Sequence, residues 1–272
     1  AANDITRRTG QPVIVENKPG ANGLIAAQQV ARAAPDGYTV FITTMTTQSV
    51  NPFLYKKLPY DPVADFIPVA MISKTAMVLV VRNTEDQPKS VAELTARMQA
   101  AGSKLSFASG NTSSLVAGKT YSNAVSSPAL HFPYKGIPQA VTDLMAGAVD
   151  FMFSDLTVAN PLVQQGRLRG LGVTGPTRAS TLPDVPTMRE AGMPIELSVW
   201  AGAYVPAKTP HAVVVRLNEL LNQATQSKQG QERFKQTGGT VDTMSPEEFA
   251  KFNEQEVLFW GRAVRGAGIQ PE

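Results

Sequence analysis

The segment LSFASGNTSSLVAG, residues 105–118, predicts a short buried strand, a loop of small uncharged polar residues, and the start of a helix. A strand followed directly by a helix is the repeating unit of α/β folds. The first turn of a helix has unpaired N–H groups and carries about half a positive charge. Hydroxyl and amide side chains around that turn therefore allow three interpretations: a phosphate loop, a serine nucleophile, or a binding site for another anion.

Strands and helices alternate along the rest of the chain as well. The apolar run AMVLVV, residues 76–81, is the clearest strand, and SVAELTARMQAAG, residues 90–102, is a helix with a capping-box spacing between Ser90 and Glu93. This alternation predicts an α/β fold with parallel sheets covered by helices on both faces. The other expected strands are 12–17, 38–44, 105–108, 149–155, 168–175 and 196–206, and the other expected helices are 23–34, 113–125, 138–147, 158–166, 210–227 and 246–267.

The length of 272 residues favours two lobes. Strand-like segments meet Gly, Pro and Ser near 102–104 and 204–206, where we expect the chain to cross between lobes. The first lobe would comprise residues 1–102 plus 206–272, and the second lobe residues 103–205. The two C-terminal helices would then pack back onto the first lobe.

Composition excludes several classes of function. The net charge is +3, and the basic residues form no run, which argues against nucleic-acid binding. The chain has no cysteine, so disulfides, thiolate metal sites and a cysteine nucleophile are excluded. No stretch approaches 18 apolar residues, so no membrane insertion is expected. A small positive excess is compatible with an anionic ligand.

Two glycine-rich segments resemble nucleotide-binding motifs only in part. GNTSSLVAGKT, residues 110–120, ends like a phosphate loop, but seven residues separate its glycines where that motif has four. GLGVTG, residues 170–175, matches the dinucleotide pattern, but PTRASTLPDVPT follows it in place of the required helix. We therefore expect no nucleotide cofactor, and no other cofactor is indicated.

A hydrolase would need a base beside its serine. The chain has only two histidines, His131 and His211, and it lacks the Gly-x-Ser-x-Gly and Ser-x-x-Lys motifs. Histidine and acid clusters typical of zinc sites are also absent from the sequence. An enzyme that uses Ser109 or Asp155 with one histidine is the less favoured alternative.

An anion-binding site is favoured because similar loops recur. TTMTTQSVNP, residues 43–52, is a second polar loop at a strand end. PYKG (133–136) and FSD (153–155) are further loops at the same end of the second lobe's strands. Ligands of open parallel sheets bind beyond the carboxyl ends of the strands. Two lobes that face each other with such loops would form a clamp for a carboxylate, which helix N–H groups and hydroxyls can hold without a cation.

The order of motifs resembles one known family. The segments GQPVIVENKPGANGLIAAQQVARAAPDGYTVFITT, NPFLYKKLPYDPVADFIPVA, SFASGNTSS, FPYKG, DLMAGAVDFMFSD, LPDVPTMREAG and AGIQ look like those of the substrate-binding proteins of tripartite tricarboxylate transporters, the Bug or TctC family. The resemblance covers nearly the whole chain. It implies a periplasmic receptor of the type II periplasmic-binding-protein fold, a Venus flytrap of two α/β lobes joined by a two-strand hinge. Its expected partners are inner-membrane transporter subunits and a small di- or tricarboxylate, acidic amino acid or aromatic acid.

The resemblance also implies a set of ligand-binding positions. Gln48 stands where many relatives have histidine, and Asp155 would face the ligand or a bound water unless it only caps the next turn. Trp200 would either line the hinge or fill the core. The implied ligand-binding residues are Thr44, Thr46, Thr47 and Gln48 in the first lobe, and Ser109, Gly110, Asn111, Thr112, Ser113, Ser114, Tyr134, Lys135, Gly136 and Asp155 in the second. Plain capping of the helix by Ser113 is the structural alternative for that loop.

One departure from the family pattern affects the first lobe. Family members begin with a strand and a PF-x-x-GG type loop, whereas this sequence begins inside or after the first helix. We therefore expect a chain without its leader, first strand and one carboxylate loop, which would bind weakly or pair an open sheet edge with a neighbour. A sensory relative that reports its ligand to a signalling partner is a further alternative.

Overall fold

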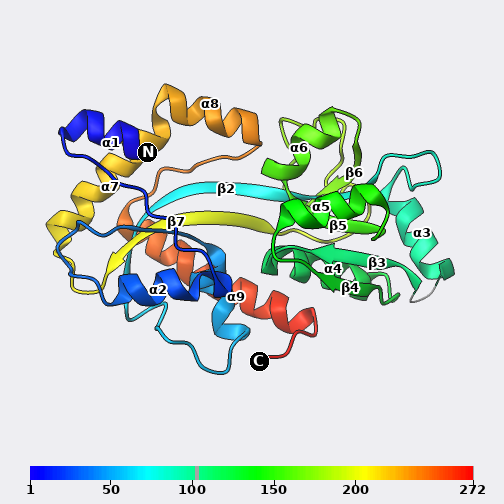
Figure 1. The fold of residues 1–272 in the computed structure, drawn as a ribbon, viewed down its shortest axis with the longest axis horizontal. Helices are drawn as coiled ribbons and strands as arrows, with labels where there is room; N and C mark the ends of the chain where they lie inside the picture. The colour runs from blue at the N-terminus through cyan, green and yellow to red at the C-terminus, as the bar shows by residue number, and fades with distance from the viewer. Residues whose placement is uncertain (102–103, 272) are drawn as a thin grey trace.

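Strand β2 (Phe66–Arg82) runs through the molecule and joins its two lobes (Figure 1). The computed structural model describes residues 1–101 and 104–271. The first part of β2, Phe66–Ala76, pairs with β7 (Ser198–Pro206). The second part pairs with β5 (Phe151–Asp155) and with β6 (Leu168–Val173). The apolar run within 76–81 is buried because strands flank it on both edges.

Most of the other elements match predicted helices and strands, but residues 2–9, 130–133 and 228–237 and three short helical turns form elements that were not predicted. The bounds of the other elements are α1 (Ala2–Thr9), η1 (Ala21–Gly23), α2 (Leu24–Ala31), β1 (Phe41–Thr44), the π-helical turn η2 (Thr46–Val50), η3 (Asn51–Phe53), α3 (Val91–Ala101), β3 (Ser106–Ser109), α4 (Thr112–Ala124), β4 (Leu130–Pro133), α5 (Ile137–Ala146), α6 (Leu156–Gln164), α7 (His211–Gln226), α8 (Lys228–Thr237) and α9 (Pro246–Gly266).

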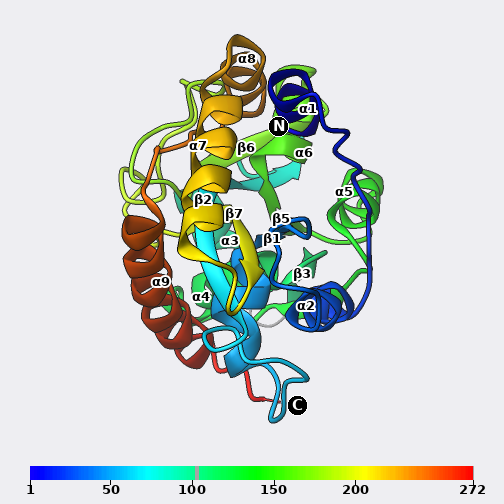
Figure 2. The same cartoon turned by 90° about the vertical axis from the view of Figure 1, so that its left-hand side faces the viewer.

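The described strands form one sheet in the order β1-β7-β2-β5-β3-β4, with β6 paired to β2. In Figure 1, α1, α2, α7 and α8 lie around the left-hand part, and α3 to α6 surround the right-hand part. Figure 2, viewed from the left of that picture, shows α7 and α9 running along the β2–β7 layer. One apolar core contains residues of both lobes. Helix α9 links the two parts, because it contacts β2, η2 and α4.

The sheet is mixed, where the sequence predicted parallel sheets. Strands β3, β4 and β5 are mutually parallel, but β2 is antiparallel to β5, β6 and β7. The reason is that β2 is shared by both lobes, so the chain enters the second lobe along β2 and returns along β7. The predicted α/β Venus-flytrap class is nevertheless confirmed by solved relatives described below.

Two strands, β2 and β7, connect the lobes, and one further segment pairs with β2. Lys74 of β2 is in register with Trp200 of β7, and its backbone also exchanges two 2.7 Å hydrogen bonds with Thr240. Trp200 is buried, and its indole N–H donates to Glu256 of α9 over 2.8 Å. The tryptophan therefore fills the core beside the hinge strands.

Strand β2 changes its pairing partner near Ala76–Met77, from β7 on one side to β5 on the other. The expected crossing at 102–104 includes residues 102–103, which lie outside the described residues. The expected crossing at 204–206 falls at the end of β7, within the first lobe's part of the sheet. The proposed lobe limits of 102 and 206 thus differ from the points where the strands change partners.

Two local expectations were wrong. Residues 12–17 form no strand, and the side chain of Ile14 is 87% exposed. A strand needs a neighbour for its backbone groups, and among the described bonds the Val13 N–H finds only the Thr6 hydroxyl. The tail also contains α8, a polar helix absent from the prediction, between the two long ones.

Across the described residues, no helix combines the length and apolar character needed to cross a membrane.

Candidate functional site

Three loops of the second lobe meet where β3, β4 and β5 end. These strands are parallel, so their carboxyl ends share one edge of the sheet. The Tyr134 N–H donates to the Ser109 carbonyl over 2.8 Å. A Cβ on Gly110 would lie 2.3 Å from the Ile137 nitrogen, so only glycine permits this approach. The structure thus brings together the loops 109–114 and 134–136 and the end of β5.

The N-terminus of α4 lies at the centre of this arrangement. Asn111 is its cap, and the Asn111 Oδ1 accepts bonds of 2.9 Å from the Ser114 N–H and from the Ser113 hydroxyl. The Ser114 hydroxyl in turn accepts from the N–H groups of Gly110 and Asn111, over 3.1 and 3.2 Å. The cap is therefore Asn111, whereas the capping alternative named Ser113.

Capping occupies several side chains that the sequence offered as ligand donors. The helix start is held in place by the hydroxyls of Ser113 and Ser114 and by the side-chain and backbone oxygens of Asn111. Helix geometry leaves the N–H groups of Thr112 and Ser113, the first two residues of α4, without an intrahelical acceptor. These two amides and the helix dipole are the part of the loop best suited to an anion.

Asp155 lies beside this helix start. Its Oδ2 accepts a 3.1 Å hydrogen bond from the Asn111 side-chain amide. Its Oδ1 is buried and has no partner among the described residues. Burial raises the pKa of the Asp155 carboxyl, and the Asn111 bond only partly opposes this. Asp155 occupies the cap position of α6 but makes no side-chain capping bond there, so the capping alternative does not account for it.

Ser109 and His131 are in contact, and Ser109 with one histidine is a pair that the enzyme alternative requires. Their Oγ and Nε2 atoms are 2.7 Å apart, because the two residues lie on the paired strands β3 and β4. The imidazole stacks on Phe107, with ring centroids 4.9 Å apart. Burial, with a smaller effect of Lys119, lowers the pKa of His131. The described hydrogen bonds include no carboxylate that orients this ring, as a hydrolytic triad requires.

The first-lobe positions lie at the end of β1 and in η2. The Thr47 hydroxyl is 2.8 Å from that of Thr43, and Gln48 is completely buried. Both carboxamide atoms of Gln48 lack a partner among the described residues. Turn η2 packs against α9 and approaches α4. The two predicted halves of the site are thus on neighbouring elements.

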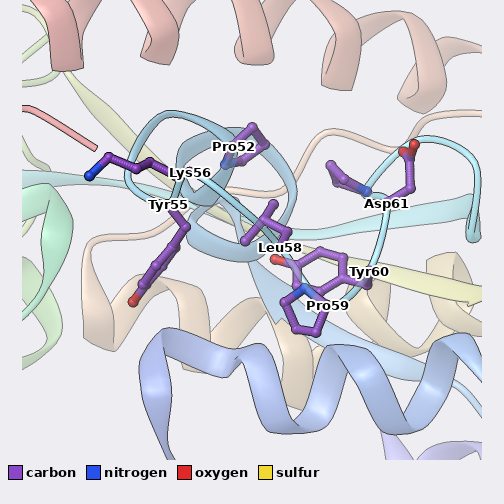
Figure 3. Close-up of a pocket in the computed structure, with 8 residues that line it drawn as sticks. Pro52, Tyr55, Lys56, Leu58, Pro59, Tyr60 and Asp61 are labelled. Atoms are coloured by element: carbon purple, nitrogen blue, oxygen red, sulfur yellow. The ribbon is translucent and has the colours of Figure 1, made fainter. Parts of the chain in front are cut away.

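Two surface cavities lie away from these residues. One of about 540 Å³ follows η3 and is lined by Pro52, Tyr55, Lys56, Leu58, Pro59, Tyr60, Asp61 and Pro62 (Figure 3). In Figure 3 the Lys56 amino group points away from the Tyr60 ring. Another, of about 700 Å³, lies between α1 and α8 and includes Ile72 of β2. Neither is lined by the predicted ligand-binding residues.

One glycine-rich motif has a structural explanation. In GLGVTG, Gly170 and Gly172 are in β6, and a Cβ on them would meet Val185 at 3.1 Å and Met188 at 2.6 Å. Their absent side chains make room for neighbouring ones. Within the described part of the chain, no group of three or more His, Cys, Asp or Glu side chains could hold a metal ion.

Comparisons with known proteins agree with the resemblance seen in the sequence. The chain is 36% identical over 259 residues to the UPF0065 protein in the tcbD-tcbE intergenic region of Pseudomonas sp. strain P51, covering 94% of this chain and 76% of that protein. It is 31% identical over 266 residues to protein BugT of Bordetella pertussis, covering 96% and 81% of the two chains.

Solved structures share the whole fold. The R. palustris protein Rpa4515 with adipate superposes with a TM-score of 0.93 at 28% identity, covering 100% of this chain and 91% of that one. The periplasmic binding protein BugD gives 0.89 at 33% identity, covering 100% and 92%. MatC from Rhodopseudomonas palustris with bound malate gives 0.86 at 28% identity, covering 97% and 91%.

The family model of the tripartite tricarboxylate transporter family receptor, TctC, matches residues 1–269. The chain therefore belongs to this family, whose members are solute-binding proteins and not enzymes.

Proposed function

We propose that this protein is a periplasmic receptor that captures a small carboxylate between its lobes and delivers it to a tripartite tricarboxylate-type transporter. The observation that carries the proposal is the convergence of three strand-end loops on the N-terminus of α4. There the amides of Thr112 and Ser113 face no intrahelical acceptor. An anion bound to them would gain charge-assisted hydrogen bonds from a preorganised helix end.

The first lobe would supply the opposite wall. Turn η2 approaches α4, and Gln48 carries a buried carboxamide without a partner among the described residues. A buried amide of this kind is costly unless a ligand or water satisfies it. The Gln48 carboxamide can both donate and accept hydrogen bonds, so it suits the polar end of a ligand more than its apolar part.

Two relatives suggest the class of ligand. The solved structures described with adipate and with malate share the fold of this chain at 28% identity. Both compounds are small dicarboxylates. Bending of β2 and β7 near Lys74 and Trp200 would close the lobes on such a molecule.

Calorimetric titration with adipate, malate, succinate, glutamate and benzoate tests the proposal. At least one acid should bind, and should also raise the unfolding temperature. Ligand at 100 times its dissociation constant stabilises the folded state by about 2.7 kcal/mol. Neutral amides of the same acids serve as controls and should not bind. Absence of binding and of stabilisation with every acid would refute the proposal.

A further inference from the structure

The proposed anion site has an acid beside it. Asn111 caps α4 through its carbonyl oxygen, and the amide group of the same side chain donates to Asp155. One side chain therefore separates the Asp155 carboxyl from the helix end that would hold a ligand carboxylate. An ionised Asp155 would repel that ligand across a short, poorly solvated distance.

No cation compensates the acid among the described residues. The charged side chains on the elements that contact β5 have described interactions with other groups, and none of these interactions is with Asp155. In β2, Lys74 lies over the Phe252 ring, and Arg82 is 3.6 Å from Asp86. Lys119 of α4 contributes to the lowered pKa of His131. Asp143 of α5 contributes to the raised pKa of Tyr134. The Asn111 amide is the only polar side chain described in contact with the Asp155 carboxyl.

The two oxygens of Asp155 differ. Oδ2 accepts from Asn111, whereas Oδ1 is buried without a partner among the described residues. A buried oxygen that lacks a donor is costly as a carboxylate, but as a protonated acid it becomes a hydrogen-bond donor. A ligand carboxylate at the start of α4 is an acceptor that needs such a donor.

We propose that Asp155 binds the ligand as a neutral acid, with Oδ1–H donating to the ligand carboxylate, so that capture takes up one proton. This inference rests on the proposed function. The proton comes from solvent and adds to Asp155, no covalent bond to the ligand forms, and the proton returns to solvent when the ligand leaves. Burial, which already raises the pKa of Asp155 in the free protein, reduces the cost of protonation.

Affinity should then depend on pH in a defined direction. Ligand binding raises the pKa of Asp155 further, because the added negative charge favours the neutral acid. Between the pKa values of the free and bound protein, the association constant should fall up to tenfold per pH unit as pH rises. Below that interval, and above it, the constant should level off.

Calorimetry with adipate between pH 5.5 and 8, in buffers of different ionisation enthalpy, counts the protons taken up. Uptake by the wild-type protein should approach one within the interval. Asp155→Asn supplies an N–H donor that does not titrate. This variant should therefore bind adipate with no proton uptake beyond that of the ligand itself. Asp150→Asn is the matched control, because Asp150 precedes β5 at its other end and binds Ser106.

The outcomes separate the two proposals. Adipate binding by the wild-type protein with no proton uptake at any pH would overturn the role of Asp155 and leave the receptor function intact. Equal uptake in wild type and Asp155→Asn would do the same. A preference for malate over succinate without uptake would show that an ionised Asp155 accepts from a ligand hydroxyl instead. Absence of binding by every acid would refute both proposals.

Discussion

Replacement of Thr112 by proline removes one proposed ligand donor with little disturbance of the fold. Thr112 is the first residue of α4, a position that tolerates proline because its N–H has no intrahelical acceptor. The preceding residue, Asn111, has φ −159° and ψ 175°, an extended conformation that a following proline allows. The capping box between Asn111 and Ser114 involves neither atom that the substitution removes.

The expected loss follows from one charge-assisted hydrogen bond. Such a bond to a carboxylate contributes about 1.5–3 kcal/mol, which corresponds to a roughly 10- to 150-fold weaker dissociation constant. Thr112→Ala is the matched control, because it removes the hydroxyl and keeps the N–H. We expect Thr112→Pro to bind at least tenfold more weakly than Thr112→Ala.

The assay is calorimetric titration of both variants with the acid that binds the wild-type protein most tightly. Thermal unfolding without ligand checks that both variants fold, and their midpoints should agree within a few degrees. Equal affinities of Thr112→Pro and Thr112→Ala, with both proteins folded, would refute the assignment of the Thr112 amide to the ligand.

Four further outcomes are expected. Ser114→Ala breaks the capping box and should cost about 1 kcal/mol in urea unfolding; an unchanged midpoint would contradict this. Gly110→Ala forces its Cβ against the Ile137 backbone and should weaken carboxylate binding, so wild-type affinity in titrations would count against the loop contact. Because the pKa of Asp155 is raised on folding, wild-type stability should fall as pH rises through the folded pKa, whereas Asp155→Asn should lack this fall; parallel profiles of unfolding free energy would disprove it. With Trp260→Phe, Trp200 is the remaining tryptophan, and its fluorescence should shift when ligand closes the hinge; a constant spectrum at saturation would argue against movement there.

The convergence of the second-lobe loops was predictable from the sequence. Residues 105–108 and 149–155 carry clear strand patterns, and parallel strands place their carboxyl ends together. The segment 76–81 was equally clear because it is continuously apolar. Its extension back to Phe66 was not, since Ser73 and Lys74 interrupt the apolar pattern where the strand crosses between lobes.

Other features depend on tertiary partners that a sequence does not show. The run 12–17 has strand-forming residues, but a strand requires a neighbour to pair with. Asn111 and Ser113 are equally good caps by residue type, so the backbone conformation decides between them. The Ser109–His131 contact arises from strand register, which local patterns leave open.

The most direct test of the account is a crystal structure of this protein with its tightest-binding acid. A ligand carboxylate oxygen should lie about 2.9 Å from the amide nitrogen of Thr112 or Ser113, between α4 and η2. A ligand bound elsewhere, such as in the cavity beside Tyr55 and Tyr60, with the start of α4 facing only solvent or protein, would contradict it.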